Sequence, residues 1–435
     1  MAPLNILIVG CGIAGPTLAT FLLLSPVPAT EKPRITIVER SSAIRSQGQN
    51  IDIRGVGVAV IRKLGLEAAV RAATTGEEGV QWVTKENHVW ASIPASGDAG
   101  FHSPTSDIEI MRGRLAEICW NRSKALSDDI QRKGGAGIDF IFGDHLSDLR
   151  QERAKVCVQF AKSGDSKTYD LVVGADGLHS ETRKMVWGAD GEEERVKQLG
   201  MYGAFFSIPP ADTDTKWRRC FHTAGRRVMM LRPDNQSGRT TVFLNIVNEK
   251  DSRLHDAARN GHDGVEAQKG LIKEYFHDAG WESDRVLGEM METKDFYYET
   301  VAQVKMETWS KEKVVLLGDA GYCPSPMSGM GTTLAMYGAY TLAGALVQHP
   351  QDISAALAKY EQTMRPSVDD AQRLMPGMLR LMNPETPWGV CMVDTVIKFL
   401  IWTRLIRVLM MLKGSKTATK PVDEYGFEQL PDWRE

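Results

Sequence analysis

The sequence predicts an α/β protein in which a Rossmann-like domain is interleaved with a mainly antiparallel β-sheet domain and followed by a long C-terminal helix. Two observations predict the first domain: glycine-rich turns at 10–15 and 318–335 each follow an apolar strand and precede a helix. A third observation, aromatic and β-branched runs between about 200 and 300, predicts the second sheet. A chain of 435 residues is also too long for one ordinary core.

The N-terminal forty residues predict a βαβ unit. The continuous apolar run at 5–9 is typical of a strand covered on both faces of a parallel sheet. Pro16 is tolerated in the first turn of the helix that follows. The next strand, 34–40, alternates with β-branched residues and ends in an acid, Glu39.

Gly10, Gly12 and Gly15 form a GxGxxG turn between this strand and helix. The first two glycines allow a sharp turn and close approach of a pyrophosphate, and the third lets the helix pack on the strand. The helix N-terminus adds free N–H groups and a favourable dipole. Glu39 stands where an acid can accept from both ribose hydroxyls. This context favours a dinucleotide site over a glycine cluster that serves packing alone.

Two later turns bear on which dinucleotide is bound. GADG at 174–177, followed by Ser180 and Arg183, comes after a strand, although such a turn is common by itself. Gly318 and Asp319 also follow a strand, and Asp319 can accept from a ribityl or ribose hydroxyl. The small residues from Gly329 to Thr333 begin a helix whose N-terminus can face an anionic ring edge.

The order of these segments predicts a discontinuous first domain. We expect residues 1–195 and 300–385 to bind the nucleotide, with small excursions into the other domain near 80–110. Residues 196–299 are expected to form the substrate-binding β-sheet domain, and residues 386–435 a C-terminal helix and tail.

Composition excludes several other classes. The net charge is −3 and no basic stripe occurs, so no nucleic-acid partner is expected. The six cysteines show no metal-ligand spacing, so we expect no metal site and reduced thiols in a cytoplasmic protein. The apolar N-terminus is split by a glycine-rich turn and lacks a basic start, which argues against a signal peptide.

The apolar run at 390–412 is long enough to cross a bilayer but contains Asp394, Lys398, Arg404 and Arg407. These charges fall at several angles on a helix, so no single polar face collects them. We therefore expect a helix that packs against the rest of the protein. Membrane contact by this helix is the second alternative and is not favoured.

The three motifs GxGxxG, GADGxxSxxR and GDAGYCPSPMSGMG, in this order, resemble those of the FAD-dependent aromatic hydroxylases of the p-hydroxybenzoate hydroxylase type. These are group A flavoprotein monooxygenases. QGQNIDIRG at 47–55 and the run at 296–322 are similar to the branch of tetracycline monooxygenases and secondary-metabolite tailoring enzymes. The resemblance covers residues 4–380 and implies a Rossmann-like FAD-binding domain of the GR2 type. The resemblance also implies why two distant turns are glycine-rich: each would hold one end of the same FAD molecule.

The resemblance also implies the cofactor-binding residues. Gly10, Gly12 and Gly15 would hold the pyrophosphate, and Glu39, with Arg40 beside it, the adenosine ribose. Arg112 would contact FAD, although Arg114 is an alternative, and Asp176 would help hold FAD and a transient NAD(P)H. The residues implied around the ribityl chain and flavin ring are Gly318, Asp319, Pro326, Gly329 and Gly331. Tyr322 replaces a histidine of many relatives, which puts in doubt any role of that ring nitrogen.

The implied reaction is monooxygenation with NAD(P)H and O₂ through a flavin C4a-hydroperoxide, which hydroxylates an aromatic or polycyclic small molecule, with secondary metabolism as the expected setting. The flavin carries this chemistry, so no catalytic side chain is assigned. The residues that we expect to contact the substrate are Gln49, Arg54, Phe206, Met229, Leu231, Phe243 and Tyr298, each of which has an alternative as core.

Other functions stay open. Epoxidation and Baeyer–Villiger insertion would start from the same flavin chemistry, and a halogenase is disfavoured because no WxWxIP occurs. A non-catalytic FAD-fold binding protein and a plain NAD dehydrogenase are alternatives from other classes. The substrate, NADH or NADPH preference and the oligomeric state are not predicted.

Overall fold

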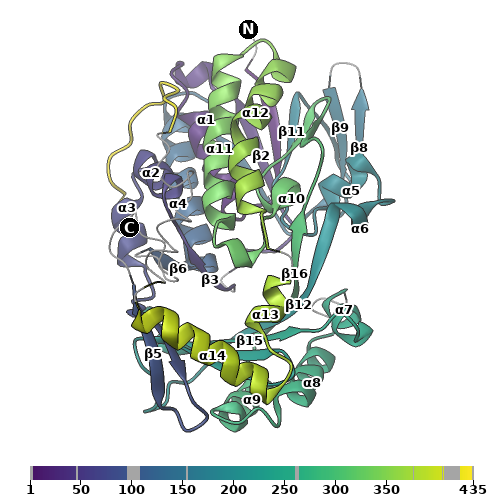
Figure 1. The fold of residues 1–435 in the computed structure, drawn as a ribbon. Helices are drawn as coiled ribbons and strands as arrows, with labels where there is room; N and C mark the ends of the chain where they lie inside the picture. Colours follow the sequence, from purple (N-terminus) through teal and green to yellow (C-terminus); the bar gives the residue numbers. More distant parts are fainter. Residues whose placement is uncertain are drawn as a thin grey trace.

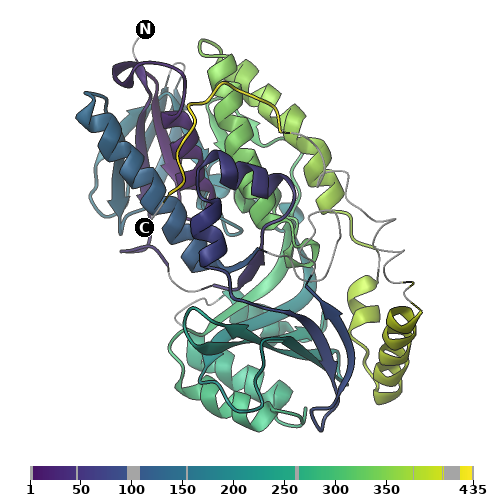
Figure 2. The same cartoon turned by 90° about the vertical axis from the view of Figure 1, so that its left-hand side faces the viewer.

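The structure is a computed structural model that describes residues 3–45, 48–95, 108–152, 155–259, 264–375, 377–403, 405 and 422–433. Figure 1 shows a body of helices packed on a parallel sheet above a large antiparallel sheet, with the C-terminal helix α14 lying across the latter. Figure 2 shows the same two bodies from the side.

The upper body is built on a six-stranded sheet in the order β17-β18-β11-β1-β2-β7. The chain enters it at β1 and returns to it more than 300 residues later at β18, which pairs with β11 in parallel. β17 alone of these strands is antiparallel to its neighbour. The strand bounds are β1 Asn5–Val9, β2 Arg34–Glu39, β7 Ile138–Phe142, β11 Leu171–Gly174, β17 Ser310–Lys311 and β18 Val314–Leu316.

β1 is apolar throughout because both of its faces are covered. Ile6 and Ile8 face the layer of α1, α4, α11 and α12, and Leu7 and Val9 face a small three-stranded sheet. The helices are α1 Ala14–Leu23, α4 Arg112–Arg132, α11 Gly331–Gln348 and α12 Ile353–Ala371. The small sheet consists of β8 Leu146–Glu152, β9 Lys155–Phe160 and β10 Ser166–Tyr169, and α5 Glu181–Trp187 packs beside it.

The lower body is a seven-stranded sheet in the order β16-β12-β15-β14-β13-β4-β5. Its strands are β4 Gly79–Val83, β5 Val89–Pro94, β12 Val196–Ile208, β13 Arg218–Thr223, β14 Arg227–Asp234, β15 Arg239–Val247 and β16 Tyr297–Val304. All neighbours are antiparallel except β13 and β4. β4 and β5 come from the excursion expected near 80–110, and β16 carries the chain back to the upper body.

One face of this sheet packs on α7 Ser252–Arg259, α8 Val265–Phe276 and α9 Ser283–Glu292, which enclose a second core. The opposite face is turned toward the upper body. The remaining short elements are η1 Ala29–Glu31, β3 Asn50–Asp52, α2 Val56–Lys63, α3 Glu67–Ala72, β6 Glu109–Met111, α6 Glu192–Arg195, α10 Asp319–Tyr322 and η3 Pro326–Ser328.

The chain then crosses to the lower body through α13 Met378–Met382 and α14 Pro387–Trp402, which contacts β5 and β13. Its packing is thinner than expected: Val393 is its one buried residue, and Trp388, Phe399 and Trp402 are exposed by 74, 55 and 80%. In the part of the chain that the structure describes, no helix is long and apolar enough to span a membrane. Arg404 and Arg407 of the apolar run at 390–412 lie outside the described residues.

Residues 422–433 return to the upper body and close the core beside α1 and α11 (Figure 2). Tyr425 is 8% exposed and its ring fills the space above Gly344, where an added Cβ would lie 2.2 Å from it. The hydroxyl of Tyr340 donates to the carbonyl of Asp423 at 2.5 Å.

We expect Tyr425→Ala to lower the free energy of unfolding by about 3 kcal/mol, because it leaves a cavity against α11. The matched control is Glu424→Ala, which removes an exposed ion pair with Lys63 and should cost less than about 1 kcal/mol. Urea denaturation of both variants measures the difference. Equal losses would contradict a structural role for this tail.

Candidate functional site

One cavity of about 1590 Å³ lies between the two bodies. At one end it is lined by residues after β2, among them Arg40 and Ser42. It continues past Arg112 and Asp319 to the exposed face of the seven-stranded sheet. A cavity of this size exceeds the usual 300–1,000 Å³ of small-ligand sites, so it has room for more than one ligand.

The three glycine-rich motifs meet beside this cavity. Gly10 has φ +110°, and a Cβ on it would lie 2.4 Å from the carbonyl oxygen of Ala175 in the second motif. A Cβ on Gly318, in the third motif, would lie 3.6 Å from the Cβ of Ala14. Segments about 300 residues apart are therefore in contact, as one ligand held at both ends requires.

The glycines of the first turn have different tasks. A Cβ on Gly15 would lie 2.2 Å from the carbonyl oxygen of Gly10, so this glycine permits the contact of helix and turn. A Cβ on Gly12 would meet nothing within 4 Å. The open space at Gly12, before the N-terminus of α1, is a cradle of the kind that accepts a pyrophosphate.

The carboxylate of Glu39 is fixed at the edge of this cradle. Its Oε2 accepts from the backbone N–H of Cys11 and its Oε1 from that of Ser41, each at 2.9 Å. An ionised carboxylate has about four acceptor positions, so it retains capacity for ribose hydroxyls. Arg40 follows it in the cavity wall.

Asp176 is engaged by its own motif. Its carboxylate accepts from the hydroxyl of Ser180 at 2.5 Å and from the backbone N–H and hydroxyl of Thr182 at 2.9 Å. Burial raises the pKa of Asp176, against the effect of these hydrogen bonds. Asp176 lines the cavity, and these bonds fix the turn into α5.

Arg183, the last residue of the second motif, ties that motif to the third. Its side chain is fully buried and donates to the carbonyls of Ala320 and Leu178 at 2.6 and 2.7 Å. Its charge is balanced by Glu192 at 2.5 Å. Arg183 therefore holds the two turns in register.

Ionisable groups gather around Arg112 in the cavity wall where the two bodies meet. Burial works to lower the pKa of this guanidinium, but the groups around it, Tyr297, Asp319 and Glu299, raise it above its ordinary value. Burial also raises the pKa of Asp319, and Arg112 offsets part of that effect. A cation and carboxylates held in this way suit a polar ligand that carries partial charges.

A chain of hydrogen bonds leads from this cluster to the surface. The hydroxyl of Tyr297 donates to Glu299, and Nε2 of the exposed His179 lies 3.4 Å from the same carboxylate. Burial acts to raise the pKa of Glu299, but the hydrogen bonds from His179 and Tyr297 outweigh it and lower the pKa.

The third motif shapes the cavity wall below α11. Gly329 has φ +61°, which favours glycine, and Pro326 begins the short helix before it. α11 begins at Gly331 without a side-chain cap, and a Cβ there would lie 3.8 Å from Oδ1 of Asp319. The free N–H groups of an 18-residue helix thus face the cavity beside Asp319.

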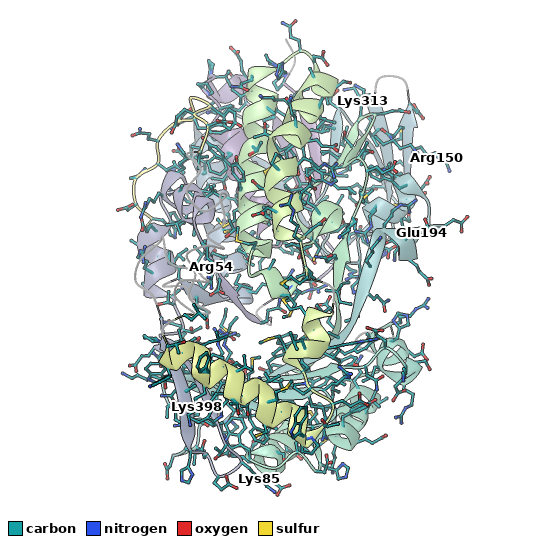
Figure 3. All side chains as sticks on the ribbon, in the orientation of Figure 1. Arg54, Lys85, Arg150, Glu194, Lys313 and Lys398 are labelled. Carbon is teal, nitrogen blue, oxygen red and sulfur yellow. The ribbon has the colours of Figure 1, made fainter. Side chains whose placement is uncertain are left out.

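Four of the seven expected substrate residues line the cavity: Gln49, Arg54, Phe206 and Phe243. Of these, Phe206 reaches the cavity only at its edge, because it is 4% exposed and stacks on Phe296 in the core beside α7–α9. Figure 3 shows Arg54 at the lower edge of the upper body. The other three, Met229, Leu231 and Tyr298, do not line it, because they point to the opposite face and pack against α7–α9. Successive strand residues alternate in direction, so their neighbours Met230 and Tyr297 line the cavity instead, with Phe205.

Sequence reasoning missed a buried ion cluster in the cavity wall. Arg218 and Arg232 both pair with Glu77 and with Glu109 across the junction of β6 and the large sheet. The side chains of Glu77 and Glu109 are 0 and 3% exposed. The four residues are far apart in the sequence and match no motif, so no local signal could have found them.

Two departures from the family motifs are explained by position. Tyr322 packs in the core, where its hydroxyl lies 3.0 Å from that of Tyr360, and does not line the cavity. Arg114 also lines the cavity but pairs with Glu117 on its own helix at 2.8 Å, whereas the side chain of Arg112 is exposed to the cavity and interacts electrostatically with Asp319. Geometry therefore favours Arg112 as the ligand contact.

These features define a site for an extended dinucleotide. The chain belongs to the FAD binding domain family, whose model matches residues 4–374. It is 35% identical to the FAD-dependent monooxygenase asL6 of Sarocladium schorii over 97% of this chain and 98% of that protein. It is 32% identical to the flavin-dependent monooxygenase eupH of a Phoma species over 100 and 98% of the two chains.

Solved structures agree with this assignment. Tetracycline destructase Tet(55) superposes with a TM-score of 0.76 at 29% identity, covering 98% of this chain and all of that one. HpxO of Klebsiella pneumoniae, in complex with FAD and uric acid, shares the fold with a TM-score of 0.68 at 17% identity, over 94 and 97% of the two chains. The protein is an FAD-dependent monooxygenase, and its open cradle at Gly12 and the uncapped start of α11 fit the two halves of FAD.

Proposed function

We propose that the protein hydroxylates an aromatic or polycyclic small molecule in secondary metabolism, with O₂ as oxidant and NAD(P)H as a transient reductant. The observation that carries the proposal is the continuity of the cavity from the second and third glycine-rich motifs to the face of the large sheet that carries both apolar and polar side chains. Phe205, Phe243 and Met230 lie on this face and offer an adaptable apolar wall. All six cysteines are unpaired, which supports a reducing, cytoplasmic setting.

We assign cofactor binding to residues 1–195 and 300–385 and substrate binding to residues 196–299, with 386–435 as helix and tail. FAD supplies the activation of O₂. Gly10, Gly12 and Gly15 would receive its pyrophosphate, Glu39 and Arg40 its adenosine half, and Asp319 its ribityl chain. Arg112 and the start of α11 would face the ring. Asp176 and Gly318 would hold the turns beside the cofactor, and Pro326, Gly329 and Gly331 would border the flavin ring.

The test is NAD(P)H oxidation by the purified yellow protein across a panel of phenols, polyketides and indoles. We expect at least one compound to stimulate oxidation and to yield a product heavier by one oxygen atom. Oxidation without stimulation or product across all aromatic classes would contradict the proposal. A product with oxygen inserted into a ring bond would point to a Baeyer–Villiger reaction instead.

We expect Phe243→Ala to raise KM by roughly tenfold to a hundredfold, as loss of an aromatic contact worth about 1.5–3 kcal/mol predicts. The ring of Phe243 stacks on Phe205 with centroids 4.4 Å apart in the cavity. The matched control is Leu231→Ala on the opposite face, which should lower stability but leave KM unchanged. Steady-state kinetics with the accepted substrate decide. A larger KM effect for Leu231→Ala would place the substrate elsewhere.

A further inference from the structure

The end of the cavity next to α14 carries a histidine that the proposed function does not use. His222 lies on β13 among the cavity-lining residues, and its side chain is 7% exposed. Its Nδ1 lies 2.9 Å from Oδ1 of Asp394, which is 172 residues later on α14. The apolar surroundings here include Val228 and Met382.

The partner fixes which ring nitrogen carries the proton. An ionised carboxylate can only accept, so Nδ1–H of His222 donates to Asp394. In the neutral ring Nε2 is the acceptor, and no hydrogen bond among the described residues engages it. A histidine oriented by a carboxylate through one nitrogen and open at the other is the arrangement of a general base.

α14 is held firmly enough to place this carboxylate. The backbone N–H groups of Gly225 and Arg226, in the β13–β14 turn, donate to the carbonyls of Glu385 and Pro384 at 2.8 and 3.0 Å. These bonds join the start of α14 to the end of the strand that carries His222. The pair is therefore built into the connection between the sheet and the C-terminal segment.

Two unpartnered amide oxygens lie on the same part of the cavity wall. Oδ1 of Asn245 and Oδ1 of Asn383 are buried without a hydrogen-bond partner, and the residues are 3 and 4% exposed. Asn245 stands in the same row of the sheet as His222, with Val228 between them. Buried acceptors without a donor are costly, so this wall is suited to a ligand that brings hydroxyl groups.

We propose that the His222–Asp394 pair is a substrate site that accepts the proton of an acidic hydroxyl, a phenol or an enol. This inference rests on the proposed function. The O–H bond breaks, its electron pair stays on oxygen, and the proton bonds to Nε2. The resulting imidazolium is stabilised by Asp394. The ionised substrate is richer in electrons than the neutral hydroxyl compound, which favours its attack on an electrophilic oxygen.

The two arginines of the ion cluster in the cavity wall cannot replace this pair as a base. Arg218 and Arg232 are each paired with Glu77 and Glu109, so that the cluster is balanced. Neither guanidinium can accept a proton. A guanidinium can stabilise a bound phenolate without taking its proton, so the comparison of His222→Gln with the wild type decides whether His222 holds that proton.

The test uses 4-nitrophenol and 4-nitro-1-naphthol, whose ionised forms are yellow, with the FAD-loaded protein and no NAD(P)H. At a pH one unit below each probe's own pKa, about a tenth of the free probe is ionised. Difference spectra should show that the wild type binds at least one probe mainly as the phenolate. His222→Gln should bind it with the ionised fraction of the free probe, and Asp394→Asn should give an intermediate fraction.

The matched control is Glu385→Gln, which removes an exposed ion pair with Arg226 on the same segment and should leave the wild-type spectrum unchanged. FAD content and thermal midpoint verify that each variant is folded. If His222→Gln is unfolded, the Asp394→Asn spectrum decides alone. Three results would overturn the inference. Either variant could give the same phenolate signal as the wild type, the wild type could bind the probes only in their neutral form, or the wild type could bind neither probe. Because no turnover is measured, failure to hydroxylate any substrate would leave this result intact.

Discussion

Gly12→Glu should yield a folded but colourless protein. A side chain at this position extends into open space, since an added Cβ meets nothing within 4 Å. Its carboxylate would occupy the cradle before α1 and repel a pyrophosphate there. We expect the affinity for FAD to fall at least a hundredfold, equivalent to about 2.8 kcal/mol.

The measurement is FAD retained after dialysis, by absorbance, together with the thermal midpoint of the FAD-free protein. The control is Gly270→Glu on α8, where an added Cβ also meets nothing within 4 Å, so a glutamate is introduced away from the cavity. It should stay yellow. Yellow protein from Gly12→Glu would show that the first motif does not hold the cofactor.

Arg183→Leu should be the most destabilising single change in the cofactor domain. It removes the donor to Ala320 and Leu178 and leaves Glu192 with only the longer ion pair to Arg195 at 3.8 Å. Loss of one partner of a buried pair typically costs about 3–5 kcal/mol, a large share of the stability of a folded domain. FAD binding should weaken as well, because the second and third motifs lose their connection.

The neighbouring Lys184→Leu is the control, since Lys184 makes an exposed pair with Glu181 at 2.8 Å and should contribute less than about 1 kcal/mol. Thermal unfolding of both variants in excess FAD and without it separates stability from cofactor binding. Equal midpoints for the two variants would contradict the bridging role of Arg183.

The cofactor half of the site could be predicted because its chemistry is local. Gly10, Gly12 and Gly15 need their backbone freedom within six residues, and Glu39 follows on the next parallel strand. The sheet that joins them to Asp319 is a common solution for such motifs. Motif order was therefore enough to predict that segments about 300 residues apart lie in contact.

The substrate half could be predicted less well because both faces of the large sheet carry large apolar side chains. Met229 and Leu231 pack against helices while Met230 faces the cavity, and hydrophobicity does not distinguish these environments. Pairs of residues far apart in the sequence could not be predicted for another reason. His222 and Asp394 come together only because the chain returns to the large sheet through α13 and α14, and no local sequence pattern encodes that return.

The insertion of β18 beside β11 has a consequence for synthesis on the ribosome. α1 is made first and α4 about 100 residues later, but its other packing partner, α11, ends at Gln348, so the surface of α1 that contacts α11 stays uncovered until over 300 further residues are made. At about 5–20 residues per second, the nascent N-terminal segment stays unfinished for roughly 20 s to one minute. Until α11 is made, the third motif at its start is also missing, so the two glycine-rich ends of the cofactor site cannot yet meet.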